Sequence, residues 1–138
     1  MHEGPSGGAQ ARRAAKSTAR RPEVMQVIPR TYDLVLWLIP RLKEFPREQR
    51  FLLGDRIQTG AMDLLSLLIE ANYTARKEDL LRQANLELEK TRYLLRMASD
   101  LHYLNGRRYE FAAATVTEIG RMIGGWIQAT RSRAGAHR

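Results

Sequence analysis

The sequence contains no cysteine, and only one of its three histidines, His102, lies away from the two ends. A disulfide framework, a thiolate nucleophile and a cysteine-ligated zinc site are therefore excluded. A centre built from several histidines is nearly excluded as well, so we expect no metal and no cofactor. The longest apolar run, 34–40, has seven residues, against the ~18 that a membrane span requires. We expect no contact with a membrane.

The N-terminus lacks the apolar segment of a signal peptide, which favours a cytoplasmic protein. A P-loop, a Gly-x-Gly-x-x-Gly motif and a Gly-x-Ser-x-Gly motif are also missing, so the common nucleotide-binding and hydrolase signatures are absent. Asp55 and Asp63 are two turns apart, and Glu87 and Glu89 face apart on a helix, which fits solvated surfaces better than acid–base catalysis. We therefore expect no enzymatic activity and no small-molecule substrate.

Positive charge is in excess, and it is concentrated at the two ends of the chain. The net charge is +8 over 138 residues, a length that suits one domain. Residues 1–30 contribute +4 and residues 131–138 contribute +3, whereas the middle is nearly balanced at +1. We predict a disordered basic arm over 1–30, a helical bundle over 31–130 and a basic tail over 131–138.

These basic ends have two possible roles, nucleic-acid contact and solubility. The residues that the first role would use are Arg12, Arg13, Lys16, Arg131 and Arg133.

The composition of the middle favours helices. Leucine (18) and alanine (16) far outnumber valine and isoleucine together (11), a balance that favours helices over strands. Apolar residues recur with the helical period in four segments, so we predict an all-α protein. Short links between the segments indicate an antiparallel up-down four-helix bundle. The predicted helices cover residues 32–45, 46–72, 76–103 and 107–130.

The inward faces of these helices are expected to form the core, with Pro40 kinking the first helix. The third helix carries its apolar stripe as far as His102. Other apolar residues lie on the helix flanks, where they either widen the core or contact a second copy of the chain. The residues predicted to face inward in the first helix are Tyr32, Val35, Leu38, Ile39 and Leu42.

The last helix carries an unusual density of glycine. Gly120 and Gly124 are four residues apart and cost roughly 1 kcal/mol each relative to alanine, so we expect their smooth surface to serve close packing of another helix. That helix lies either within the chain or in a second subunit. A phosphate-binding loop is not expected, because no strand precedes the glycines. The candidate packing residues are Gly120, Gly124, Gly125 and Trp126.

Basic side chains stand where they oppose helix stability. Positive charge at a helix N-terminus is unfavourable, yet three of the predicted helices open with a basic pair. In the third helix Arg92 and Arg96 are four residues apart and share a face. Phosphate is the natural partner of such arginines, and ion pairs with Glu89 and Asp100 are the alternative. The basic pairs at helix starts are Arg47 and Arg50, Arg76 and Lys77, and Arg107 and Arg108.

Arg96 and His102 raise an enzymatic alternative. Some small helical ribonucleases of the HEPN class place an arginine and a histidine about this far apart near a helix end, where they assist cleavage at the RNA 2′-hydroxyl. Any basic helical protein produces this spacing by chance, and Met97 follows the arginine where a polar residue is more usual. We favour the simpler interpretation, in which His102 packs at the end of a helix.

Three segments resemble a known family over about residues 30–130. Residues 45–57 (FPREQRFLLGDRI) resemble the start of the second helix in a group of four-helix-bundle proteins. That group includes proteins encoded in intervening sequences of large ribosomal RNA genes and the accessory variability determinant (Avd) proteins of diversity-generating retroelements. Residues 90–96 (KTRYLLR) and 118–127 (EIGRMIGGWI) are similar to the Avd branch.

The resemblance implies a bundle that assembles as a barrel-like homopentamer with a positively charged surface. It also implies association with the element's reverse transcriptase and binding of its template RNA, with cDNA as a further ligand, during mutagenic cDNA synthesis. Arg92 and Arg96 match a nucleic-acid-binding arginine pair of the family. The alternative is a structural protein of the ribosomal intervening-sequence type, which has no polymerase partner.

Overall fold

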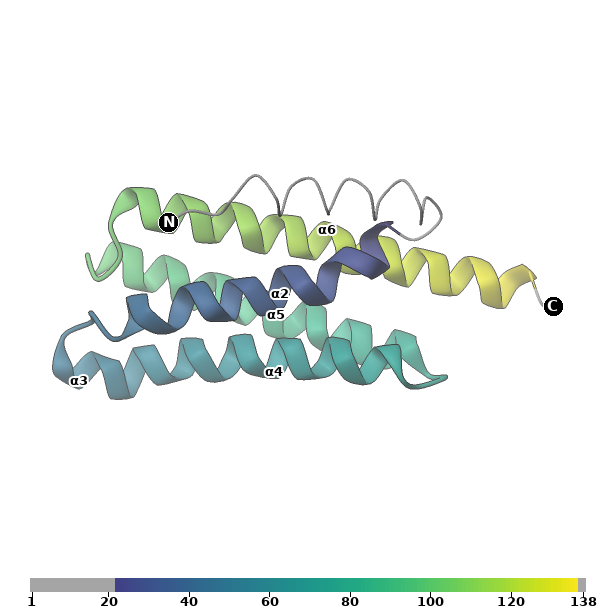
Figure 1. Cartoon of the computed structure of the whole chain (residues 1–138), viewed down its shortest axis with the longest axis horizontal. Helices are drawn as coiled ribbons and strands as arrows, with labels where there is room; N and C mark the ends of the chain where they lie inside the picture. The colour runs from purple at the N-terminus through teal and green to yellow at the C-terminus, as the bar shows by residue number, and fades with distance from the viewer. Residues whose placement is uncertain (1–21, 137–138) are drawn as a thin grey trace.

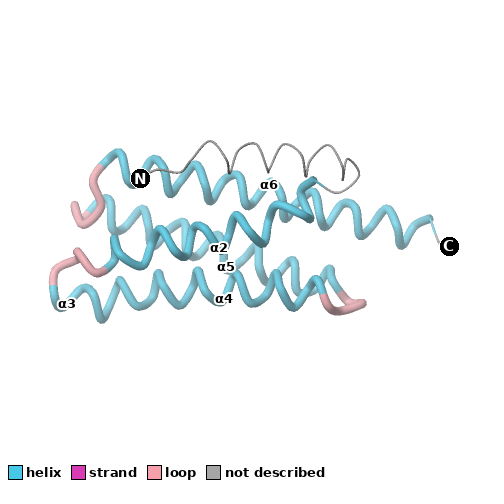
Figure 2. Tube along the Cα trace, viewed as in Figure 1, coloured by secondary structure: helices cyan, strands magenta, loops and turns pink. Residues whose placement is uncertain are grey.

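The computed structural model describes residues 22–136, and four long helices make up most of this part of the chain. They are α2 (Pro22–Leu42), α4 (Asp55–Asn72), α5 (Lys77–Asp100) and α6 (Gly106–Ala136). Two short segments, α3 (Arg47–Gln49) and the π-helix η1 (Arg50–Gly54), lead into α4. The helices run alternately up and down one long axis (Figure 1), and residues 22–136 contain no strand (Figure 2). The predicted fold class, an all-α four-helix bundle, is confirmed.

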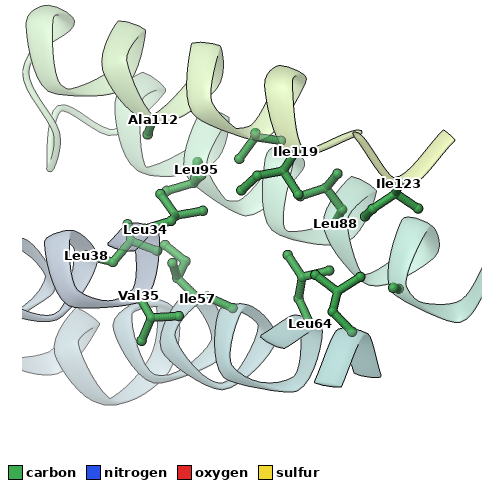
Figure 3. Close-up of a cluster of buried hydrophobic side chains, with 14 of the residues drawn as sticks. Leu34, Val35, Leu38, Ile57, Leu64, Leu88, Leu95, Ala112, Ile119 and Ile123 are labelled. Carbon is green, nitrogen blue, oxygen red and sulfur yellow. The ribbon is translucent and has the colours of Figure 1, made fainter. Parts of the chain in front are cut away.

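Each long helix packs against two others around a common core. α4 contacts α5, α5 contacts α6, and α2 closes the ring by contacting both α4 and α6. Figure 3 shows side chains from all four helices meeting in the centre, among them Leu38, Ile57, Leu95 and Ile119. None of these four exposes more than 1% of its surface. Full burial of such a side chain stabilises the fold by about 1.5–3 kcal/mol.

The first helix begins at Pro22, ten residues before the predicted start at Tyr32. Residues 22–30, which we assigned to the basic arm, therefore belong to α2, and the predicted boundary is wrong. Val27 and Thr31 are fully buried one turn apart, and the Thr31 hydroxyl donates to the Val27 carbonyl at 2.8 Å. This register brings Leu34 into the core and leaves Tyr32 53% exposed, so the predicted burial of Tyr32 is also wrong.

Pro29 lies in the part of this helix that the sequence analysis missed, whereas Pro40 lies inside the predicted range. Pro29 and Pro40 both lie inside α2, and both are exposed. A proline removes one backbone hydrogen bond from a helix, but on the solvent side water can bond the carbonyl that loses its donor. α2 accordingly continues through Pro40 to Leu42. The remainder of the predicted arm, with Arg12, Arg13 and Lys16, lies outside the described residues.

The predicted helix over 46–72 is divided by a π turn. Pro46 caps α3 instead of forming its first residue, and the amide of Asp55 donates to the Arg50 carbonyl five residues back. The turn exposes two adjacent large apolar side chains, Phe51 by 70% and Leu52 by 63%. Single π turns within helices are rare and frequently lie at functional sites.

α5 ends at Asp100 in a Schellman motif. The amide of Tyr103 donates to the Ala98 carbonyl at 2.8 Å, and the amide of His102 donates to the Ser99 carbonyl at 2.9 Å. His102 has a φ of 67°, the left-handed conformation that glycine usually supplies at this position. Its side chain is exposed, so the prediction that His102 continues the core stripe is wrong.

α6 is longer than predicted at its C-terminal end. Asn105 caps its start by accepting the Arg108 amide at Oδ1, at 2.8 Å. The helix then runs to Ala136 instead of ending near Thr130. Most of the segment predicted as a basic tail, 131–138, is therefore helical.

Candidate nucleic-acid interface

The predicted basic residues do not form one surface, because successive helices start at opposite ends of the bundle (Figure 1). One end holds the starts of α3 and α6, with Arg47, Arg50, Arg107 and Arg108. The other end holds the start of α5 and the last turns of α6, with Arg76, Lys77, Arg131 and Arg133. Arg92 and Arg96 lie on α5 between these ends.

Arg92 and Arg96 differ in how firmly they are held. Arg92 donates from Nη1 to the Thr117 hydroxyl of α6 at 3.0 Å, and its Nε lies 3.3 Å from Glu89. Among residues 26–135, the one acidic partner of Arg96 is Asp100, at 3.9 Å, and the Arg96 side chain is 65% exposed. Both ion pairs that we considered as alternatives to phosphate binding are therefore present. Exposed pairs of this kind contribute about 0–1 kcal/mol, so neither prevents a phosphate from binding.

Two of the predicted basic residues have structural partners. Lys77 donates from Nζ to the carbonyls of Ala71 and Thr74, at 3.0 and 2.9 Å, and so satisfies carbonyls at the C-terminal end of α4. Arg108 contacts Glu44 at 2.8 Å and ties α6 to the turn that follows α2. The Arg108 hydrogen bond and charge lower the pKa of the Glu44 carboxyl.

Glu78 organises a second cluster, at the opposite end of the bundle. Arg131 of α6 contacts it at 3.0 Å and Arg82 of α5 at 2.9 Å, so one carboxylate binds two guanidinium groups. The hydrogen bonds from Arg131 and Arg82 lower the pKa of Glu78. Arg76 contacts Asp79 nearby, at 3.4 Å. Arg131 and Arg76 are therefore already paired within the chain.

Another group of basic side chains has no acidic partner among residues 26–135. Four of them, Arg47, Arg50, Arg107 and Arg133, were predicted to bind nucleic acid. The sequence analysis did not single out the others, because the availability of a cation depends on which acids lie nearby in space. Apart from Lys77, which binds two backbone carbonyls, the group comprises Arg41, Lys43, Arg47, Arg50, Arg56, Lys90, Arg107, Arg121 and Arg133.

The glycine-rich segment of α6 combines packing and surface positions. A Cβ on Gly120 would lie 3.3 Å from Leu88 Cδ2 and 4.0 Å from Arg92 Nη2, so this glycine lets α5 approach closely within the chain. Trp126 is 4% exposed and belongs to the core, and Gly125 is half-buried. Gly124 is exposed, with no atom within 4 Å of a Cβ built on it.

The ribonuclease alternative finds no support in the surroundings of His102. The residue lies beyond the end of α5, in a turn whose backbone it closes, and not on the same helix as Arg96. A groove of about 310 Å³ between α4 and α5 contains Asp63 and Glu87 together with Arg56 and Lys90. Within residues 22–136, histidine and acidic side chains form no group of three or more that would hold a metal ion.

Comparison with known proteins identifies a family. None of the helices in the described part of the chain is long and apolar enough to cross a membrane. No curated protein matches the sequence. The profile of a protein family described as bAvd-like matches residues 25–130, which span the bundle from α2 into α6. The chain therefore belongs to the bAvd-like family.

Proposed function

We propose that this protein is a nucleic-acid-binding accessory factor of a diversity-generating retroelement. In this role it associates with the reverse transcriptase and the template RNA in the cytoplasm and supports mutagenic cDNA synthesis. Membership of the bAvd-like family supports the role. The protein supplies binding and no catalysis: it holds RNA, and cDNA as a further ligand, through phosphates, so sequence readout is weak.

The arginine pair on α5 is the observation that carries RNA binding. Thr117 and Glu89 hold the Arg92 guanidinium at the contact between α5 and α6. Arg96, one turn further along, is largely exposed and only loosely paired. Guanidinium groups bind phosphate oxygens through two parallel hydrogen bonds. When a phosphate displaces the exposed carboxylate partners, little binding free energy is lost, because those ion pairs are weak.

Salt-dependent binding tests this assignment. In Arg92→Ala with Arg96→Ala we expect weaker RNA binding and a salt slope reduced by about two. The matched control is Arg30→Ala with Arg82→Ala, which also removes two ion-paired arginines, one on α2 and one in the first two turns of α5. A double α5 variant with the wild-type salt slope would overturn the assignment.

Purification from the native host tests the retroelement role. We expect the tagged protein to bring down a reverse transcriptase and one discrete non-coding RNA. Recovery of neither, from a folded and expressed protein, would favour a structural protein of the ribosomal intervening-sequence type.

Assembly as a barrel-like homopentamer is a further part of the proposal. A ring joins two different patches on each subunit. Phe51 and Leu52 on the π turn form one exposed apolar patch. The outer surfaces of the adjacent helices α2 and α4 form the other, with Tyr32 (53% exposed), Leu36 (53%), Met62 (46%) and Ile69 (42%).

Native mass spectrometry tests the assembly. We expect a pentamer for the wild type and monomers for the double variant Leu36→Glu with Ile69→Glu. In that variant each interface between subunits would bury two charges. Leu86→Glu on the outer surface of α5 is the matched control and leaves the ring intact. A wild-type protein that is monomeric at micromolar concentration would contradict the proposal.

A further inference from the structure

The outer surface of α5 carries a row of exposed side chains that neither the core nor the ion pairs use. Leu86, Lys90, Tyr93 and Met97 follow one another at intervals of three or four residues, which aligns them along one helix face. Leu86, Tyr93 and Met97 expose 58%, 63% and 49% of their surfaces, and Lys90 is exposed as well. We call these four residues the outer row. It contains an aromatic ring and a cation but no acidic side chain.

Tyr93 lies between two available cations. Lys90 is three residues before it and Arg96 three residues after it, and positions three apart are neighbours on a helix surface. Lys90 has no acidic partner among residues 26–135, and Arg96 contacts Asp100 only at 3.9 Å. An exposed ring with a cation on either side offers a stacking surface and two phosphate contacts.

This combination fits an unpaired nucleotide better than a protein. The flat faces of bases are free in single-stranded RNA and hidden in a duplex, and proteins that bind single strands stack bases on exposed aromatic rings. The centres of protein–protein interfaces are depleted of charged residues, lysine among them. A protein docked on the outer row would bury Lys90 in such a centre, whereas an RNA strand places phosphates beside it.

We propose that Tyr93 stacks on an unpaired base of the bound RNA while Lys90 and Arg96 contact the phosphates on either side. α5 thereby selects single-stranded RNA over duplex. This inference rests on the proposed RNA-binding function and adds the class of RNA to it.

The chain supplies a matched control for the tyrosine. Tyr73 is 85% exposed, more than Tyr93, and lies in the turn between α4 and α5. The cations that follow it are engaged, since Arg76 contacts Asp79 and Lys77 donates to two backbone carbonyls. If exposure of the ring alone determined RNA binding, Tyr73→Ala and Tyr93→Ala would weaken that binding equally.

The test measures binding of the full chain to a short, non-self-complementary RNA and to the same sequence as a duplex. We expect Tyr93→Ala to weaken single-strand binding about tenfold and to change duplex binding less than twofold. Tyr93→Phe retains the ring and binds as the wild type does, and Tyr73→Ala has no effect. A 2-aminopurine base in the single strand reports stacking directly, through fluorescence quenching that is lost in Tyr93→Ala.

The outcomes separate this inference from the function on which it rests. If the wild type binds neither RNA, the proposed RNA binding fails and the inference fails with it. If the wild type binds RNA but Tyr93→Ala binds both forms unchanged, the inference alone is overturned. It is also overturned if Tyr93→Ala retains RNA binding but loses the oligomer or the captured reverse transcriptase, since the outer row is then a protein contact.

Discussion

Arg92 on α5 donates a 3.0 Å hydrogen bond from Nη1 to the hydroxyl of Thr117 on α6. The same guanidinium lies 4.0 Å from the point where a Cβ on Gly120 would stand. Two helices therefore fix the position of one arginine, and the glycine leaves room for it. A cation held in this way loses little conformational freedom when it binds a phosphate.

Thr117→Val should lower RNA affinity a few-fold, because it removes the acceptor that positions Arg92 and keeps the size of the side chain. Thr117→Ser retains a hydroxyl and should bind as the wild type does. The change in unfolding free energy should remain below about 1 kcal/mol, since Thr117 is exposed. Fluorescence anisotropy and urea denaturation measure the two quantities. RNA affinity unaffected by Thr117→Val would show that the contact with α6 does not position the arginine.

Alanine substitutions at Gly60 and Gly124 should have opposite effects. A Cβ on Gly60 would lie 2.9 Å from Thr91 Oγ1, and Thr91 is fully buried with its hydroxyl bonded to the Glu87 carbonyl at 3.0 Å. Because Thr91 cannot move freely, we expect Gly60→Ala to cost about 1–3 kcal/mol. Gly124 faces open space, so Gly124→Ala should stabilise the helix by about 1 kcal/mol.

Urea denaturation of the two variants measures both effects. Equal stability of the two alanine variants would refute the close approach of α4 and α5 at Gly60.

His102→Gly should stabilise the protein by about 0.5–1 kcal/mol. The reason is that His102 holds a left-handed conformation at the end of α5, which disfavours residues with a Cβ. His102→Ala keeps the Cβ and should bring no such gain, which makes it the control. Thermal denaturation distinguishes them, and a destabilised glycine variant would disprove this account.

The His102→Ala variant also tests whether the protein cleaves RNA. We expect the wild type to leave RNA intact during prolonged incubation, because the role of His102 is in the backbone turn. RNA cleavage that disappears in His102→Ala would instead favour the HEPN-like ribonuclease.

Acid should weaken the contact between α5 and α6 at Glu78. Folding lowers the pKa of this carboxyl through Arg131 and Arg82. A lowered pKa contributes stability above the ordinary carboxyl value of 4.5, and that contribution is lost as the pH falls through the folded value. Melting temperatures of the wild type should therefore fall between pH 6 and pH 3 by more than those of Glu78→Gln. An identical acid dependence in both proteins would count against the Glu78 cluster.

The helical period predicted the inner faces of α4 and α5 well, because no proline or π turn interrupts the pattern within these two helices. Leu64 and Leu68 in α4, and Leu88 and Leu95 in α5, face the core as expected. The first helix was misjudged at its start, where Pro29 obscured the pattern. The predicted apolar stripe included Tyr32, which is exposed. The buried pair Val27 and Thr31 shows which face of the helix points to the core.

The basic surface was less predictable, because pairing of charges depends on tertiary contacts. The sequence indicated Glu89 and Asp100 as partners of Arg92 and Arg96, since both are on the same helix. It could not indicate that Glu78 binds Arg131, which is 53 residues away. The left-handed turn at His102 was hidden too, because the residue is not glycine.

The contact between α2 and α6 has a consequence for the order in which the molecule folds. It joins the two ends of the described chain through the Arg30–Glu118 ion pair, 88 residues apart, and through the Trp37 and Phe111 rings, 4.8 Å apart. The other helix pairs are neighbours in sequence and meet after short loops, which costs little entropy. We therefore expect α2 to dock on α6 last and its amides to exchange with solvent before those of α4 and α5, which hydrogen exchange measures.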